Sequence, residues 1–169
     1  MKFELTILGS GSAVPTFNRN SAAQVLNVLE RYFLIDCAEG TQHQLRRFHI
    51  PYNKINHIFI SHLHGDHYFG LIGLLSTLSL QGRKGTMYIY ADPRLQEIID
   101  FQMEKMNSRF GFPVVFHPLS RKEEVEDKEA IEQWLSTLTS STSIPNPLTI
   151  SKVFLKFSKC AVSSSSAFG

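Results

Sequence analysis

A short apolar segment that ends in a cluster of metal-binding residue types constrains this chain more than any other feature. The apolar residues 58–60 are followed by three histidines and one aspartate, namely His62, His64, Asp66 and His67. Neutral imidazole and carboxylate are ligands that a borderline metal such as zinc prefers. The chain has 7 histidines in 169 residues, so their clustering favours a metal site over scattered surface histidines. The segment therefore predicts a strand whose carboxyl end carries metal ligands.

The order of these residues also predicts how they point. We expect a strand over about 56–60, and a helix that begins with Asp66 and His67. His62 and His64 then project to one side of an extended turn. This arrangement supplies two pairs of donors, enough to start two metal sites. A catalytic zinc ion needs about three protein ligands and an open position for water, so each pair alone should bind metal weakly.

Strand patterns recur along the first 119 residues. Further strands are predicted at about 2–7, 24–29, 32–35, 87–90 and 114–116. The short connection at Arg31 predicts an antiparallel hairpin between the second and third strands. Asp36 ends the third strand, which makes it a candidate partner for the second nitrogen of a ligating histidine, or an ordinary strand-end carboxylate.

Helix patterns alternate with these strands. A short helix is predicted from an N-cap at Thr41 to about Phe48, with Pro51 as its terminator. Apolar residues on nearly every side of 69–78 predict a buried helix. Asp92, followed by Pro93, is a strong start for another helix. The alternation predicts an α/β fold with layers and a mixed sheet, whose ligand-bearing loops lie at strand ends.

Composition narrows the class of protein. The chain is 43% hydrophobic, enough for the core of one domain, and its formal charge of +2 does not by itself indicate a nucleic-acid binder. We find no apolar run near the roughly 18 residues of a membrane span, and no signal peptide. Cys37 and Cys160 form no disulfide framework, so a cytoplasmic location is expected.

The character of the sequence changes near Ser120. Residues 121–132 form a charged run, and Ser and Thr dominate from Ser136 onward. We expect 1–119 to be the first half of a larger domain, and 120–169 to be an atypical Ser-rich tail. A truncated or frame-shifted gene would produce such a tail.

Three blocks of sequence resemble the metallo-β-lactamase-fold hydrolases and, within them, the ribonuclease Z family. They are 7–16 with Arg19 and Asn20, then 34–42, then 59–67 followed by 70–75. The third block is typical of the whole superfamily, whereas the three together, in this order, are specific to ribonuclease Z. The resemblance covers about residues 1–119, and it implies a metallo-β-lactamase-like layered fold that is incomplete here.

The resemblance implies a zinc-dependent endoribonuclease that removes the 3′ trailer from tRNA precursors, with two zinc ions. It assigns His62 and His64 to the first ion and Asp66 and His67 to the second. Asp66 would also accept a proton from the attacking water. A homodimer is expected, with the apolar helix at 70–80 as a candidate contact.

The resemblance also implies that the loop 12–20 approaches the acceptor end of the RNA, with Arg19 and Asn20 binding substrate. Phe17 would stack on a terminal base or anchor the loop. Two basic pairs, Arg46 with Arg47 beside His49, and Arg83 with Lys84, would add RNA-binding surface or only solubilising charge.

Downstream, the sequence departs from the family. The family completes its zinc sites with later histidines and an aspartate, but here no histidine follows His117 and no aspartate follows Asp127. His117 itself does not match the expected ligand motif. Two alternatives therefore remain: another hydrolase of the superfamily that acts on small phosphodiesters or esters, and an inactive fragment or binding module without a complete metal site.

Overall fold

The computed structural model describes residues 3–11, 16–17 and 19–119. The chain divides at Leu119 into two units, Met1–Leu119 and Ser120–Gly169, and the description below concerns the first. The predicted tail and Cys160 lie outside the described residues. Within the described part, every helix is too short or too polar to cross a bilayer.

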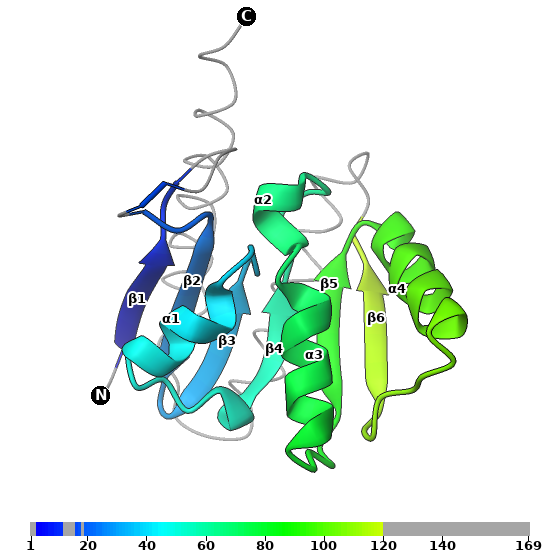
Figure 1. Ribbon diagram of the computed structural model, residues 1–169. Helices are drawn as coiled ribbons and strands as arrows, with labels where there is room; N and C mark the ends of the chain where they lie inside the picture. Colours follow the sequence, from blue (N-terminus) through cyan, green and yellow to red (C-terminus); the bar gives the residue numbers. More distant parts are fainter. Residues whose placement is uncertain (1–2, 12–15, 18, 120–169) are drawn as a thin grey trace, which may run out of the picture. The chain divides into compact units, whose positions relative to one another are not determined.

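The described unit is built on a mixed sheet whose six strands lie side by side in chain order. They are β1 (Phe3–Gly9), β2 (Ala23–Val28), β3 (Arg31–Ile35), β4 (Ile55–Phe59), β5 (Met87–Ala91) and β6 (Val114–Pro118). The first three pair antiparallel and the last three add in parallel. This confirms the predicted α/β class with a mixed sheet. Consequently β1, β3, β4, β5 and β6 all end at the same edge of the sheet (Figure 1).

Helices α1 (Thr41–Arg47), α3 (Leu71–Leu80) and α4 (Pro93–Lys105) pack on one face of the sheet, with the short α2 (Gly65–Tyr68) at its edge and η1 (Tyr52–Lys54) before β4 (Figure 1). One core joins them to the sheet. Leu45 of α1, Leu75 of α3 and Leu95 of α4 are fully buried in it, together with alternate strand residues such as Leu34 and Ile89. Residues two apart in a strand thus point into the same core.

The start of α4 agrees with its prediction, but the ends of α1 do not. Asp92 caps α4 by accepting a hydrogen bond from the Arg94 backbone N–H at 3.0 Å. The N-cap of α1 is Gly40 rather than Thr41, whose hydroxyl instead donates to the Ala38 carbonyl at 2.7 Å. The helix ends at Arg47, several residues before Pro51, so the proline is not its terminator.

The prediction that the helix at 69–78 is buried all round is only partly right. Leu71, Leu74, Leu75 and Leu78 are buried, whereas Phe69 is 63% exposed and Leu80 is 90% exposed. The helix lies on one face of the sheet, so its outer side faces away from the core. A cavity of about 410 Å³ lies between α4 and the segment that joins the end of α2 to the start of α3. It is lined by Tyr68, Phe69, Leu71, Ile72, Ile98, Ile99, Phe101 and Gln102.

Candidate active site at the carboxyl edge of β3 and β4

The carboxyl ends of two parallel strands bring the candidate site together. β3 and β4 pair in parallel through Ile35 and Phe59, so Asp36 and Ser61 follow them at the same edge of the sheet. The Asp36 backbone N–H donates to the Phe59 carbonyl at 2.8 Å. Asp36 has a φ of 56°, a left-handed conformation that aspartate tolerates better than most residues. This turn directs its carboxylate toward the histidine cluster.

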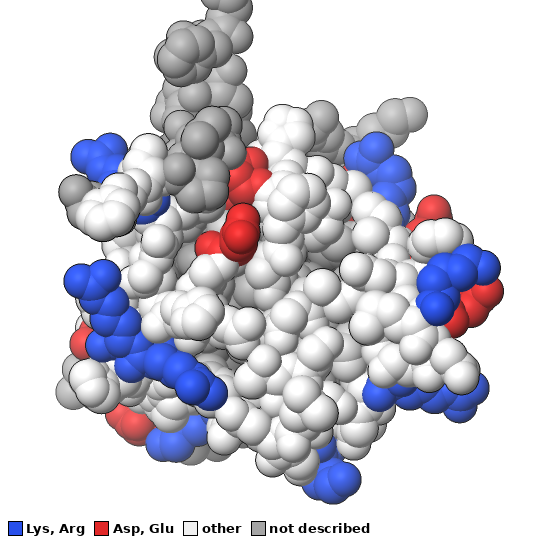
Figure 2. All heavy atoms as spheres, viewed as in Figure 1, with Lys and Arg blue, Asp and Glu red and all other residues white. Residues whose placement is uncertain are grey.

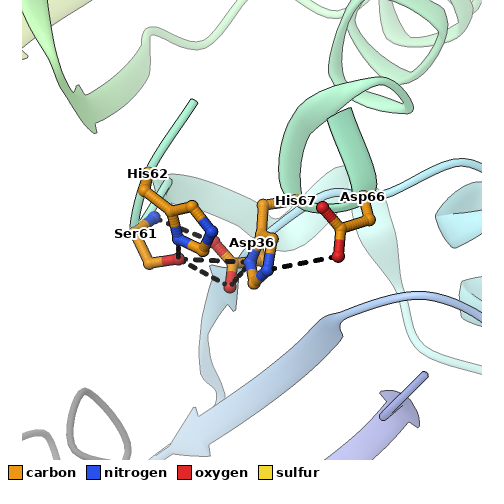
Figure 3. A network of polar contacts seen from close by, with 5 residues as sticks. All are labelled: Asp36, Ser61, His62, Asp66 and His67. Atoms are coloured by element: carbon orange, nitrogen blue, oxygen red, sulfur yellow. Dashed lines mark hydrogen bonds and ion pairs between the residues drawn. The ribbon is translucent and has the colours of Figure 1, made fainter. Parts of the chain in front are cut away.

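The buried carboxylate of Asp36 joins three groups of the cluster (Figure 3). Its Oδ1 accepts a hydrogen bond from the Ser61 backbone N–H at 2.8 Å. Its Oδ2 accepts from the Ser61 hydroxyl at 3.1 Å and lies 2.8 Å from Nδ1 of His67. A carboxylate on the second nitrogen of an imidazole fixes the orientation of the ring. The contact to Nδ1 of His67 is the one that the sequence suggested for Asp36, namely a hydrogen bond to the second nitrogen of a candidate metal-binding histidine.

Backbone contacts hold α2 against the turn that carries Asp36. The Cys37 N–H donates to the His67 carbonyl at 2.7 Å, and the Gly70 N–H donates to the Cys37 carbonyl at 2.9 Å. A Cβ atom at Gly70 would meet the Ala38 carbonyl oxygen at 2.0 Å, so only glycine permits this close approach. Burial raises the pKa of the Cys37 thiol to about 12, which keeps it protonated and structural.

The three imidazoles lie close together. The ring centroids of His62 and His67 are 3.8 Å apart, and those of His62 and His64 are 4.7 Å apart. Burial lowers the pKa of His62, and the neighbouring His67 and His64 lower it further. Burial acts in the same direction on His67, but the hydrogen bond to Asp36 and the charges of Asp36 and Asp66 outweigh it and raise the pKa of His67.

The donor types suit zinc, but their placement does not complete a metal site. Nδ1 of His67 faces Asp36, and its Nε2 lies 3.6 Å from Oδ2 of Asp66. Yet among residues 3–11, 16–17 and 19–119, no three His, Cys, Asp or Glu side chains come together where they could hold an ion. The described residues therefore do not by themselves fit a resident zinc ion.

The loop between β1 and β2 starts at the same edge. The Gly11 N–H donates to the Asn20 carbonyl at 2.9 Å, and Thr16 and Arg19 exchange two backbone hydrogen bonds at 3.2 Å. Arg19 is exposed, and Asn20 is half-buried. Phe17 is fully exposed at the tip of this turn, so the prediction of a buried loop anchor is wrong. Arg19 and Asn20 thus lie in a loop that leaves the sheet at this edge, and the described residues show no contact between them and the histidine cluster.

The structure separates residues that look alike in the sequence. Arg83 donates hydrogen bonds to Gly85, Asn53, Asn56 and Thr86 at 2.6–3.1 Å, so it holds a turn together. His117 stacks on Tyr90 in the sheet with ring centroids 4.8 Å apart, away from the histidine cluster.

No role was predicted for Ser61, although it bonds Asp36, His62 and His67. Its position two residues after the end of β4 was the signal that could have indicated such a role.

Comparisons with known proteins agree on the type of fold. A protein family described as Anti-Pycsar protein Apyc1 matches residues 3–107. A ribonuclease Z of Bacteroides thetaiotaomicron is 47% identical over 122 residues, which are 72% of this chain and 39% of that protein. A ribonuclease Z of Bacteroides fragilis is 40% identical over 144 residues, or 85% of this chain and 47% of that protein.

Solved structures extend the comparison. The short form of human tRNase Z superposes with a TM-score of 0.65 at 40% identity, covering 70% of this chain and 47% of that one. The metallo-β-lactamase-fold protein YhfI of Bacillus subtilis, at 20% identity and a TM-score of 0.53, shares the fold; the match covers 67% of this chain and 46% of that one. The chain thus spans 39% to 47% of the length of these ribonuclease Z relatives.

Proposed function

Because the chain belongs to the family matched by the Apyc1 model, and to the ribonuclease Z branch of the metallo-β-lactamase-fold superfamily, we propose that it is part of a tRNA 3′-processing endoribonuclease. Such an enzyme would hydrolyse a phosphodiester bond in precursor tRNA and release the 3′ trailer. The observation that carries this proposal is the network of Asp36, Ser61 and His67, because it orients an imidazole at the edge where the donors gather.

Each residue has a proposed task. His62, His64, Asp66 and His67 would supply metal ligands, and Asp36 would hold His67 through Nδ1. Asp66, whose carboxylate lies 3.6 Å from Nε2 of His67, would also take a proton from the attacking water. Arg19 and Asn20, on the adjacent loop, would bind the RNA.

Zinc is the proposed cofactor, with two ions in the intact family site. Such ions would supply a water of lowered pKa and would neutralise charge on the phosphate. The described residues lack a complete set of ligands, so we propose that further ligands come from outside them. The chain 1–169 alone would then be impaired in catalysis. The proposed place of action is the cytoplasm.

A homodimer is the proposed assembly. Exposed apolar side chains, including Phe69 and Phe101, stand beside the cavity between α3 and α4. A twofold interface needs a surface that is complementary to itself, and this one offers both projections and a hollow. Sedimentation analysis of Phe101→Glu against the unchanged chain tests this, with loss of the dimer expected.

The experiment that tests the function compares two substrates in zinc-containing buffer. One is precursor tRNA with a labelled 3′ trailer, and the other is a small chromogenic phosphodiester. We expect little or no cleavage of precursor tRNA by this chain, and any cleavage should leave a 3′-hydroxyl and disappear in Asp66→Asn. Efficient cleavage would contradict the proposed impairment. Turnover of the small phosphodiester, with precursor tRNA left intact, would favour the alternative of another superfamily hydrolase.

A further inference from the structure

Helix α1 carries a basic surface that the candidate active site does not use. One side of the helix is buried through Thr41 and Leu45. The side chains on its other side and just beyond its end are exposed: His43, Arg46, Arg47, Phe48 and His49. We call these five residues the α1 patch. Figure 2 shows basic side chains gathered over this helix.

Carboxylates do not neutralise the two arginines of the α1 patch. Within the described part of the chain, no ion pair joins Arg46 or Arg47 to an acidic side chain. By contrast, Arg94 pairs with Asp92 at 2.6 Å. The Arg46 guanidinium donates a hydrogen bond to the Tyr52 hydroxyl at 3.5 Å, which leaves its charge uncompensated. The patch therefore presents charge to solvent, where an anionic partner can reach it.

The end of the helix gives a second observation. His49 donates its N–H to the Arg46 carbonyl at 3.0 Å, and Ile50 donates to the Leu45 carbonyl at 2.8 Å, which is the Schellman pattern. His49 has a φ of 55°, in the left-handed region that favours glycine at this position. Glycine would end the helix with less strain. The imidazole is therefore kept at a cost to the backbone, and such strain is a reason to look for function.

The dimensions of the patch suit a nucleic-acid strand. The seven residues of α1 span about 10 Å. Along the axis of a B-form duplex one strand carries a phosphate about every 3.4 Å, so this length is on the order of two to three phosphates of a nucleic-acid strand. The exposed ring of Phe48 adds a face on which a base or sugar can rest. The helix begins at Thr41, five residues after Asp36. The patch is therefore close in sequence to the candidate active site.

We propose that the α1 patch binds the backbone of the RNA substrate, with Arg46 and Arg47 on phosphates and Phe48 and His49 against the adjacent sugar or base. This inference rests on the proposed function and adds a binding surface to it. Arg83, the rival basic residue from the sequence, is excluded because its guanidinium is already bonded within the protein.

The test measures binding of the whole chain, residues 1–169, to labelled precursor tRNA at several salt concentrations. The double variant Arg46→Gln, Arg47→Gln should bind at least tenfold more weakly. Its salt dependence should fall by about 1.5 to 2 in the slope of log affinity against log salt, because two phosphate contacts are lost. The control Arg94→Gln, Lys105→Gln removes the same charge from α4 and should change affinity by less than about twofold.

A second variant separates binding from folding. His49→Gly should keep or raise the thermal midpoint, because the strain at this position is removed, and should still weaken RNA binding severalfold. Unchanged RNA affinity in both patch variants, with the parent chain binding tightly, would overturn the α1 patch and leave the proposed function intact. A parent chain that binds anionic lipid vesicles but no precursor tRNA would overturn both.

Discussion

Oδ2 of Asp36 lies 2.8 Å from Nδ1 of His67 and so joins two segments 31 residues apart in the chain. One segment ends β3 and the other forms α2. The contact determines which nitrogen of His67 is left for other partners, and it is shorter than the 3.6 Å separation between Nε2 of His67 and Oδ2 of Asp66.

Replacing Asp36 with asparagine tests this contact. Asparagine keeps the size and tolerates the positive φ, but it removes the negative charge. The pKa of His67 should therefore fall from its raised value, which NMR titration of the imidazole measures. The control Ser61→Ala keeps the carboxylate and should leave most of the shift in place. An unchanged pKa in Asp36→Asn would show that Asp36 does not hold the ring.

The same pair predicts a dependence of stability on pH. The pKa of His67 is raised in the folded state, so its protonated form stabilises the fold. That contribution is complete below the unfolded value of about 6.5 and is lost as the pH rises through the raised folded value. Asp36→Asn should remove this component, as measured by thermal unfolding across the pH range.

His57 predicts the opposite trend on the acid side. Burial lowers its pKa to about 4, and the charges of His117 and Arg31 add to the effect. Stability should therefore fall as the pH drops from about 6.5 towards 4. The shift corresponds to at most about 3 kcal/mol, and to about 1–2 kcal/mol after allowance for the partial exposure of the ring. His57→Phe keeps a ring against Phe33 and Tyr88 and should reduce this loss; an equal loss in the variant would contradict the assignment.

Two glycines of the same region should respond differently to alanine. Gly70→Ala places a Cβ atom against the Ala38 carbonyl, and the resulting backbone shift should cost about 1–3 kcal/mol of unfolding free energy. Gly73→Ala meets only the Gln42 side chain at 3.4 Å, and in α3 it should be neutral or stabilising by up to about 1 kcal/mol. Chemical denaturation measures both, and equal effects would contradict the close packing at Gly70.

The strands and the location of the cluster could be predicted because they depend on local patterns. Alternating residues indicated the first strand and short apolar runs the others, and the strand ends indicated that Asp36 lies beside the histidine cluster. The exposure of Leu80 could not be predicted, since periodicity shows that a helix is apolar but not which neighbours cover it. Arg46 and Arg83 are equally basic in the sequence, and only the tertiary hydrogen bonds of Arg83 distinguish them.

Two leucines of α3 differ in burial, and this difference makes a direct prediction. Leu78 is fully buried and Leu80 is 90% exposed. Leu78→Ala should lower the free energy of unfolding by about 2–5 kcal/mol, whereas Leu80→Ala should change it by less than about 0.5 kcal/mol. Comparable losses in the two variants would mean that the outer side of α3 is covered.

The central claim is that His62, His64, Asp66 and His67 are metal donors whose set is incomplete in the described residues. Calorimetric titration of the chain with zinc at neutral pH tests it most directly. The account predicts weak binding that is lost in His62→Ala, His67→Ala and retained in the exposed-histidine control His43→Gln. Tight binding by the unchanged chain, or weak binding that persists without His62 and His67, would contradict it.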